Sequence, residues 1–326
     1  MLELFKVGKK TVYPIIYDVN YGQMKSINCY LLDDGDKLTL IDAGLQHEKY
    51  IEFFDAKLAE YGFTFESIDQ ILLTHHHEDH TGQVNRIIEH KAMPVFAHHL
   101  AIERVHFEQV YLHKKQDFFI RLYEEYGCSN FASERFKKMA NTLLQRDKLK
   151  LTTDVQPLYA DDLICGMKVI EVPGHSPDSI VFYDEETKWL FAGDLVLKSG
   201  STNALIDFDE KLQLLPTVAQ YEESLKRCRK LATSVVFAGH QAPFSNHAEI
   251  IEKNLARIAR KYERIVRVVE NGHHQAMDIA HALYGERLEK EFSLIMSEVI
   301  GYLYYAERQC KLSKTMKDGE WVFNVK

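Results

Sequence analysis

The sequence predicts an α/β fold, in which one large domain of short strands and helices carries a helical insertion and a small helical module follows it. Short apolar runs that end in Gly or Asp recur on both sides of residues 99–150, where apolar residues have helical spacing. The composition is that of a globular protein, with 46% hydrophobic and 27% charged residues. The 326 residues suffice for one large core with an appendage, or for two domains.

The first hundred residues predict strands early and helix later. Runs rich in β-branched and aromatic residues predict strands, and Asp33–Asp36 has the composition of a hairpin turn. A second turn is expected around Gly22. Apolar residues at helical spacing that stop at Gly62 predict a helix. The elements are strands at Thr11–Val19, Ile27–Leu32 and Lys37–Asp42, a helix at Glu48–Tyr61, and strands at Gln70–Thr74 and Pro94–Ala97.

Residues 99–150 predict two or three helices, because turn residues nearly vanish and aromatic residues recur at helical spacing. These aromatics are expected to pack against the large domain, with an apolar lid over a substrate as the alternative. Strands and helices then alternate again. The later elements are strands at Leu163–Cys165, Met167–Val172, Ser179–Tyr183, Trp189–Ala192 and Ser234–Ala238, helices at Pro216–Leu231, Ala248–Glu270, Gln275–Tyr284 and Ser293–Gln309, and a hairpin at Lys311–Val325.

The cysteine count and the charge exclude several classes of protein. The five cysteines contain no CxxC pair, which excludes a disulfide framework and favours a reducing cytoplasm. A net charge of −8 argues against a protein that binds nucleic acid over its whole surface. No run reaches the roughly 18 apolar residues of a membrane span, and Met1–Tyr17 lacks the apolar core of a secretion signal. We therefore expect a cytoplasmic protein with no membrane partner.

One stretch gathers side chains that bind metal ions. Residues 74–82 read THHHEDHTG and follow directly on an apolar run. Imidazole and carboxylate suit zinc, iron and manganese, whereas calcium prefers oxygen ligands throughout. Because alternate residues after a strand point different ways, one loop can supply two metal ions. His76 and Glu78 are expected to point away from them. The candidate ligands are His75, His77, Asp79 and His80.

Four ligands cannot complete two metal sites, and three further candidates each follow a glycine at the end of an apolar run. They are His175 in VPGHS, Asp194 in FAGD and His240 in FAGH. The glycines permit an unusual backbone angle or a close approach to the metal loop. Seven ligands suit two divalent ions with one bridging carboxylate. The other histidines are expected to have no role in the site, including His98 and His99 at a predicted strand end.

Together these motifs resemble the metallo-β-lactamase superfamily over residues 11–247. The resemblance implies an αββα sandwich with two metal ions at one edge between the sheets. Asp42, in LIDAG, matches the family's first motif, where the aspartate contacts a metal-binding side chain, not the metal itself, and holds that side chain in place. The implied ligand sets are His75, His77 and His175 for one metal, Asp79, His80 and His240 for the other, and Asp194 as the bridge.

The resemblance also implies a reaction. A hydroxide shared by the two ions would attack the substrate, and zinc is the first expectation, with iron or manganese as alternatives. Asp79 is expected to orient this nucleophile or carry its proton, so it is the catalytic candidate. Asp79 in its motif, and Asp194 where true β-lactamases commonly use a cysteine ligand, favour a small ester, thioester or lactone as substrate. Cleavage of single-stranded RNA is the alternative.

The C-terminal part predicts a second domain, so that residues 1–247 form the catalytic domain and residues 248–326 the other. Three helices and a hairpin with a turn at Asp318-Gly319 resemble a winged helix. With Tyr221–Leu225 they resemble the glyoxalase II-like branch of the superfamily, although Gln241 replaces that branch's usual glycine. The module carries 13 Lys and Arg against 12 Asp and Glu. This near neutrality favours packing or a homodimer contact over nucleic-acid binding.

Overall fold

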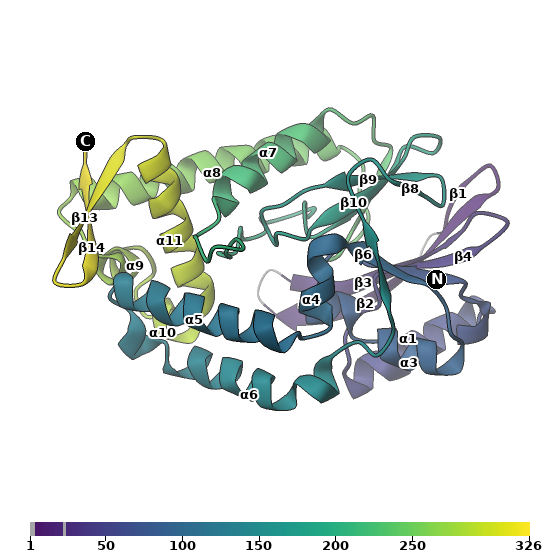
Figure 1. The fold of residues 1–326 in the computed structure, drawn as a ribbon. Coiled ribbons are helices and arrows are strands. Elements are labelled where there is room, and N and C mark those ends of the chain that lie inside the picture. Colours follow the sequence, from purple (N-terminus) through teal and green to yellow (C-terminus); the bar gives the residue numbers. More distant parts are fainter. Residues whose placement is uncertain (1–3, 22–23) are drawn as a thin grey trace.

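Two β-sheets pack face to face with helices on the outer side of each, which confirms the predicted α/β sandwich (Figure 1). The computed structural model describes residues 4–21 and 24–326, and the turn predicted around Gly22 lies outside them. The first sheet has the strand order β1-β2-β3-β4-β5-β6-β7, and the second has β12-β11-β10-β9-β8. Within the described residues, no helix has both the length and the apolar character needed to span a membrane.

The first sheet is antiparallel from β1 to β4 and parallel from β4 to β7. The carboxyl ends of β4, β5 and β6 therefore meet at one edge. The predicted turn between β3 and β4 is present, with Gly35 at a φ of 92° and its N–H donated to Asp33. The strands are β1 Phe5–Val7, β2 Lys10–Tyr21, β3 Met24–Asp33, β4 Leu38–Ile41, β5 Gln70–Leu72, β6 Val95–His98 and β7 Val155–Leu158.

The second sheet closes the sandwich over an apolar interior. Its strands are β8 Leu163–Ile164, β9 Met167–Glu171, β10 Ile180–Asp184, β11 Trp189–Gly193 and β12 Val235–Ala238. Buried side chains of both sheets interdigitate between them, as burial on both faces requires. They include Tyr30, Leu72, Phe182, Trp189 and Phe237.

Amphipathic helices cover the outer faces. Helices α1 Glu48–Glu60 and α3 Val84–His90 lie on the first sheet, where Tyr50 and Phe54 are buried against its strands. Helix α7 Thr217–Arg229 covers the second sheet through Leu225. The predicted helices agree closely with the observed ones. Three short helices, α3, α2 (Glu78–Thr81) and α10 (Arg287–Lys290), and the strands β1 and β7 were not predicted.

The helical insertion forms α4 Ile102–Val105, α5 Gln109–Glu125 and α6 Ser133–Leu149. Most of its aromatics are buried, as the expected packing requires, whereas Phe131 is exposed. Tyr123 lies 5.7 Å from Phe292 between ring centroids, and Tyr126 lies 6.0 Å from Phe323. The insertion therefore joins the sandwich to the C-terminal module.

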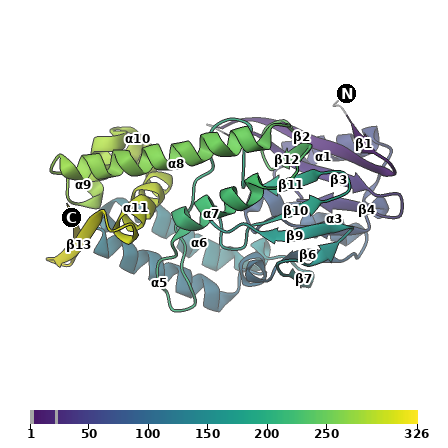
Figure 2. The same ribbon diagram turned by 90° about the horizontal axis from the view of Figure 1, so that it is seen from above.

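The C-terminal module has its helices and hairpin in the predicted order. Helix α8 runs from the sandwich to the module (Figure 2), and one apolar cluster continues from the second sheet into the C-terminal helices. Its assignment as a winged helix and the boundary after residue 247 stay predictions. The elements are α8 His247–Glu270, α9 Ala276–Tyr284, α10 Arg287–Lys290, α11 Phe292–Arg308, β13 Leu312–Lys317 and β14 Glu320–Val325.

Replacing Asp207 by Asn is expected to lower the free energy of unfolding by about 3–5 kcal/mol, because the variant leaves a buried cation unpaired. The Arg104 guanidinium donates to Asp207 at 2.8 and 3.3 Å and to the Tyr111 hydroxyl at 2.7 Å. Urea denaturation measures the change, with the exposed Glu210→Gln as the control. Equal midpoints for the two variants would contradict this role of Asp207.

Candidate metal centre

The predicted ligands come from separate strand ends and meet at one edge between the two sheets. They follow β5, β9, β11 and β12, so the sandwich itself sets their relative positions. Three overlapping groups of side chains have ligand atoms within 4.8 Å of one another and could hold metal ions. The groups are His75, His77 and His175; His75, His80 and Asp194; and Asp79, His80 and His240.

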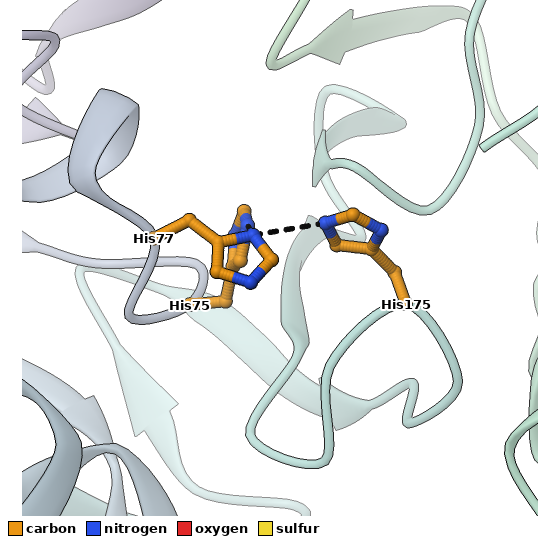
Figure 3. A group of neighbouring side chains, drawn as sticks. All are labelled: His75, His77 and His175. Carbon is orange, nitrogen blue, oxygen red and sulfur yellow. Dashed lines mark hydrogen bonds between the residues drawn. The ribbon is translucent and has the colours of Figure 1, made fainter. Parts of the chain in front are cut away.

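In the first group three imidazole rings turn their nitrogens toward one point (Figure 3). His75 Nε2 lies 2.9 Å from His77 Nδ1, and His175 Nε2 lies 3.0 Å from the same atom. The three nitrogens thus form a compact cluster of the atoms through which imidazole binds metals.

The tautomers of two of these rings follow from their outer hydrogen bonds. His175 Nδ1 lies 2.9 Å from the Asn203 carbonyl oxygen and donates its hydrogen to it. His75 Nδ1 lies 3.2 Å from Thr74 Oγ1, whose own hydrogen goes to Asp42 at 2.8 Å. In both neutral rings Nε2 therefore carries a lone pair that faces the cluster. Facing lone pairs repel each other unless a cation lies between them, which fits a metal ion.

The other two groups combine carboxylates with imidazoles. His240 Nε2 lies 3.5 Å from Asp79 and 3.3 Å from Asp194, and His80 Nε2 lies 3.8 and 3.5 Å from the same two carboxylates. Asp194 also lies 3.4 Å from His175 Nε2. Its carboxylate is thus within reach of the three-histidine group and of the group formed by Asp79, His80 and His240.

Two buried atoms of the centre lack a hydrogen-bond partner among the described residues. They are His80 Nε2 and Asp194 Oδ1, which lie at its middle. An unpaired buried polar atom costs about 1–3 kcal/mol, and a bound ion would satisfy both atoms at once. The donor set of nitrogen and carboxylate oxygen suits zinc, iron or manganese. The residues therefore fit the metal ions that the motifs imply.

His75 and His77 are in the protonation state that metal binding needs, whereas a proton competes with a metal ion at His80. Burial lowers the pKa of His75 and His77 well below the usual range, and neighbouring histidines add to this, so both rings are neutral, as metal ligands are. Burial also acts to lower the pKa of His80, but the carboxylates of Asp42, Asp79 and Asp194 outweigh it and raise that pKa. A metal ion at His80 would therefore displace a proton.

Groups behind the ligands fix their orientation. Asp42 directly follows β4 and accepts hydrogen bonds from the Thr74 N–H and hydroxyl and from His80 Nδ1, each at 2.8 Å. From the sequence, Asp42 was expected to contact and orient a metal ligand. His240 Nδ1 donates to the Ser26 carbonyl oxygen at 2.7 Å. Such outer hydrogen bonds hold the tautomer that leaves Nε2 available to a metal.

A methyl group at position 239 is expected to disrupt the centre without unfolding the chain. A Cβ built on Gly239 would lie 2.6 Å from both Asp194 Oδ1 and His80 Cε1, so one of these side chains must move. Gly239→Ala should therefore bind fewer metal ions, by elemental analysis, at an unchanged melting temperature. Gly301→Ala in α11, whose Cβ would come no closer than 3.3 Å to any neighbour, is the control. Full metal content in Gly239→Ala would contradict this steric argument.

Two residues have hydrogen-bond partners that the sequence did not predict. His76 points away from the cluster, as expected, and binds the buried Asp178 through both its N–H and Nδ1 at 2.8 and 2.7 Å. Gln241, at a φ of 69°, exchanges hydrogen bonds with the Ser199 backbone and hydroxyl. Gln241, which stands where the glyoxalase II-like branch has glycine, thus connects the 199–204 loop to the edge of the sandwich that carries the candidate ligands.

His98 and His99 lie in a separate cluster. His98 Nε2 lies 3.1 Å from Glu171 Oε1, and His99 stacks on Tyr159. His98, His99 and Glu171 form their own close group, apart from the seven candidate ligands.

Comparisons with known proteins bear on the family and the fold of the chain. The profile described as Metallo-beta-lactamase superfamily matches residues 24–240. The chain is 28% identical over 277 residues to "Probable metallo-hydrolase YqjP" of Bacillus subtilis, across 84% of this chain and 86% of that protein. It is 22% identical over 313 residues to "Atrochrysone carboxyl ACP thioesterase" of Aspergillus fumigatus, across 94% and 82%. The crystal structure of a metallo-beta-lactamase family protein from Thermus thermophilus superposes with a TM-score of 0.78 at 22% identity, across 97% of this chain and 98% of that one.

Proposed function

The chain belongs to the metallo-β-lactamase superfamily and is a metal-dependent hydrolase, and we propose that it uses two divalent metal ions to hydrolyse a thioester or a related small ester or lactone. The observation that carries the proposal is the pair of adjoining donor groups that share Asp194. A thioester comes first because the Aspergillus fumigatus relative, matched over 94% of this chain, is named a thioesterase.

We assign the seven side chains to two metal sites. Zinc is the first candidate, since imidazole and carboxylate suit it, and iron and manganese follow. When bound, two such ions supply a water that loses its proton near neutral pH and a Lewis acid for the substrate oxygen. The assigned ligands are His75, His77 and His175 for the first site, Asp79, His80 and His240 for the second, and Asp194 for both.

Three carboxylates have distinct roles in this proposal. Asp79 is the most exposed carboxylate of the set, with 20% of its side chain accessible against 10% for Asp194. It is therefore placed to take a proton from the attacking water and pass it to the leaving group. Asp194 lies between the groups and balances their charge. Asp42 holds His80 in the tautomer described above.

The buried cysteines are poor nucleophiles. Burial raises the pKa of Cys29, Cys128 and Cys228 to about 12, so these thiols stay protonated at neutral pH. This agrees with hydrolysis by an activated water and not through a covalent thioester on the enzyme.

A panel of substrates tests the proposed reaction. The metal-loaded protein is assayed on acyl thioesters, aliphatic esters and lactones, and on a single-stranded RNA at low and moderate salt. We expect turnover of thioesters with no salt-sensitive RNA cleavage. Cleavage of RNA with no turnover of any small ester would contradict the proposal and favour the alternative function.

We further propose that the chain lies in the glyoxalase II-like branch and that residues 248–326 form a winged-helix-like module for packing or a homodimer contact. Support comes from the order of α8, α9, α11 and the hairpin, and from the module's balance of 13 basic against 12 acidic residues. Gel filtration with light scattering measures the oligomeric state, and an enzyme that stays monomeric at every concentration would contradict the dimer contact.

A further inference from the structure

A buried carboxylate connects the two loops that carry the three-histidine group. These are the histidine loop, residues 74–82, and the loop of the third histidine, residues 173–179, which approach the cluster from opposite sides (Figure 3). Asp178 in the second loop is fully buried. It accepts hydrogen bonds from the backbone N–H of His76 at 2.8 Å, from His76 Nδ1 at 2.7 Å and from the Ser176 hydroxyl. One side chain thus joins the loop that holds two candidate ligands to the loop that holds the third.

The hydrogen bonds of Asp178 make this connection strong. A carboxylate has no hydrogen to donate, so His76 Nδ1 carries the hydrogen of their contact. Hydrogen bonds to an ionised group are about twice as strong as those between neutral groups. Among the described residues, Asp178 belongs to none of the groups whose atoms could hold a metal ion. Its contacts therefore act on the positions of the loops and not on the coordination itself.

The loop of residues 173–179 is held in place from its other side. A Cβ built on Gly174 would lie 2.4 Å from the Cα of Tyr221, so this loop lies directly on α7. Where the loop ends, the N–H of Ile180 donates to the Thr74 carbonyl oxygen at 2.9 Å, next to the first histidine. The histidine loop is therefore anchored through Asp178 to a loop that α7 supports.

We infer that Asp178 is a positioning residue of the first metal site and fixes the histidine loop relative to the loop of His175. The inference rests on the proposed metal sites and adds a residue that acts on them through His76. Metal ligands must lie within about 0.2 Å of their ideal distances, so a small shift between the two loops would weaken binding. Asp42 holds the histidine loop at His80, and Asp178 holds it at the three-histidine group.

Zinc binding measures this role directly. Competition with a chromophoric chelator gives the affinities of the wild type and the variants, and anomalous scattering from crystals at limiting zinc gives the occupancy of each site. Asp178→Asn keeps the shape of the side chain and places an N–H group against one of its donors. We expect zinc affinity at the first site to fall about 10–100-fold, as is usual when a group that orients metal ligands is changed.

A matched control separates this effect from a general loss of stability. Asp184 is buried like Asp178 and lies at the far end of β10, where its carboxylate pairs with Lys10 at 2.6 Å. Asp184→Asn is the same substitution in the same strand region, away from the edge that carries the candidate ligands. It should lower the melting temperature and leave the zinc affinity of both sites unchanged.

Two variants of His76 test the same connection from its other end. The amide nitrogen of His76→Asn can donate from about the position of Nδ1, whereas His76→Leu has no donor. We expect His76→Leu to lose zinc affinity as Asp178→Asn does, and His76→Asn to keep most of it. The His76 side chain is partly exposed, so these variants should fold even if Asp178→Asn does not, and they then decide the question.

The results for zinc binding and for hydrolysis are independent. Unchanged zinc affinity in Asp178→Asn or in His76→Leu would overturn the inference, even if the wild type hydrolyses thioesters. An equal loss in Asp184→Asn, or an equal loss in both His76 variants, would overturn it as well, because the effect would then not follow the hydrogen bond. If zinc affinity follows the hydrogen bond while no thioester is hydrolysed, the proposed function fails and the role of Asp178 stands.

Discussion

His77→Ala and Asp194→Ala are each expected to lower hydrolysis about a thousandfold or more and to bring the bound metal below two ions per chain. His77 Nδ1 lies 2.9 and 3.0 Å from the nitrogens of His75 and His175, and Asp194 is within reach of both donor groups. Each variant removes a side chain that no neighbour replaces. Several kcal/mol of transition-state stabilisation depend on the metals, and about 1.4 kcal/mol corresponds to tenfold in rate.

Elemental analysis and kcat/KM on a thioester measure these effects in parallel. His113→Ala, which removes an exposed histidine on α5, is the matched control and should keep both metals and full activity. Full activity in either His77→Ala or Asp194→Ala would exclude the assigned ligand set. Loss of activity at full metal content would instead give Asp194 a role other than holding metal.

Asp42→Asn is expected to weaken metal binding by about 10–100-fold at the site that includes His80, with a matching loss of activity at limiting metal. Both oxygens of Asp42 accept hydrogen bonds, from the Thr74 N–H on one side and from the Thr74 hydroxyl and His80 Nδ1 on the other. An amide presents N–H on one of these sides. Facing His80, it would favour the tautomer with hydrogen on Nε2, which cannot bind a metal.

Asparagine is chosen because residue 42 has a φ of 57°, which asparagine tolerates better than alanine. The backbone therefore stays in place, and the variant isolates the loss of charge. Asp36→Asn in the exposed hairpin turn is the control. Metal affinities are measured by competition with a chromophoric chelator. An unchanged affinity in Asp42→Asn would show that this carboxylate does not orient His80.

The sequence allowed the sandwich and the candidate ligands to be predicted, because both depend on local signals. Short apolar runs that end in Gly, His or Asp mark strand ends, and parallel strands place their carboxyl ends at one edge. His175, Asp194 and His240 could thus be grouped with the histidine loop although they lie far along the chain. The elements missed, β1, β7, α2, α3 and α10, are too short to show a clear periodicity.

The groups around the ligands could not be predicted in the same way. The Asn203 carbonyl oxygen that orients His175 is a backbone atom, which exists at every position of the chain. The pairing of His76 with Asp178 spans a hundred residues and has no motif.

Metal reconstitution tests the central claim most directly. The protein is freed of metal with a chelator, its melting temperature is compared with that of the untreated protein, and thioester hydrolysis is followed while zinc, iron or manganese is titrated back. The two-metal account predicts no activity in the metal-free protein and a rise that reaches its plateau at two equivalents per chain. Full activity in the metal-free protein would contradict it.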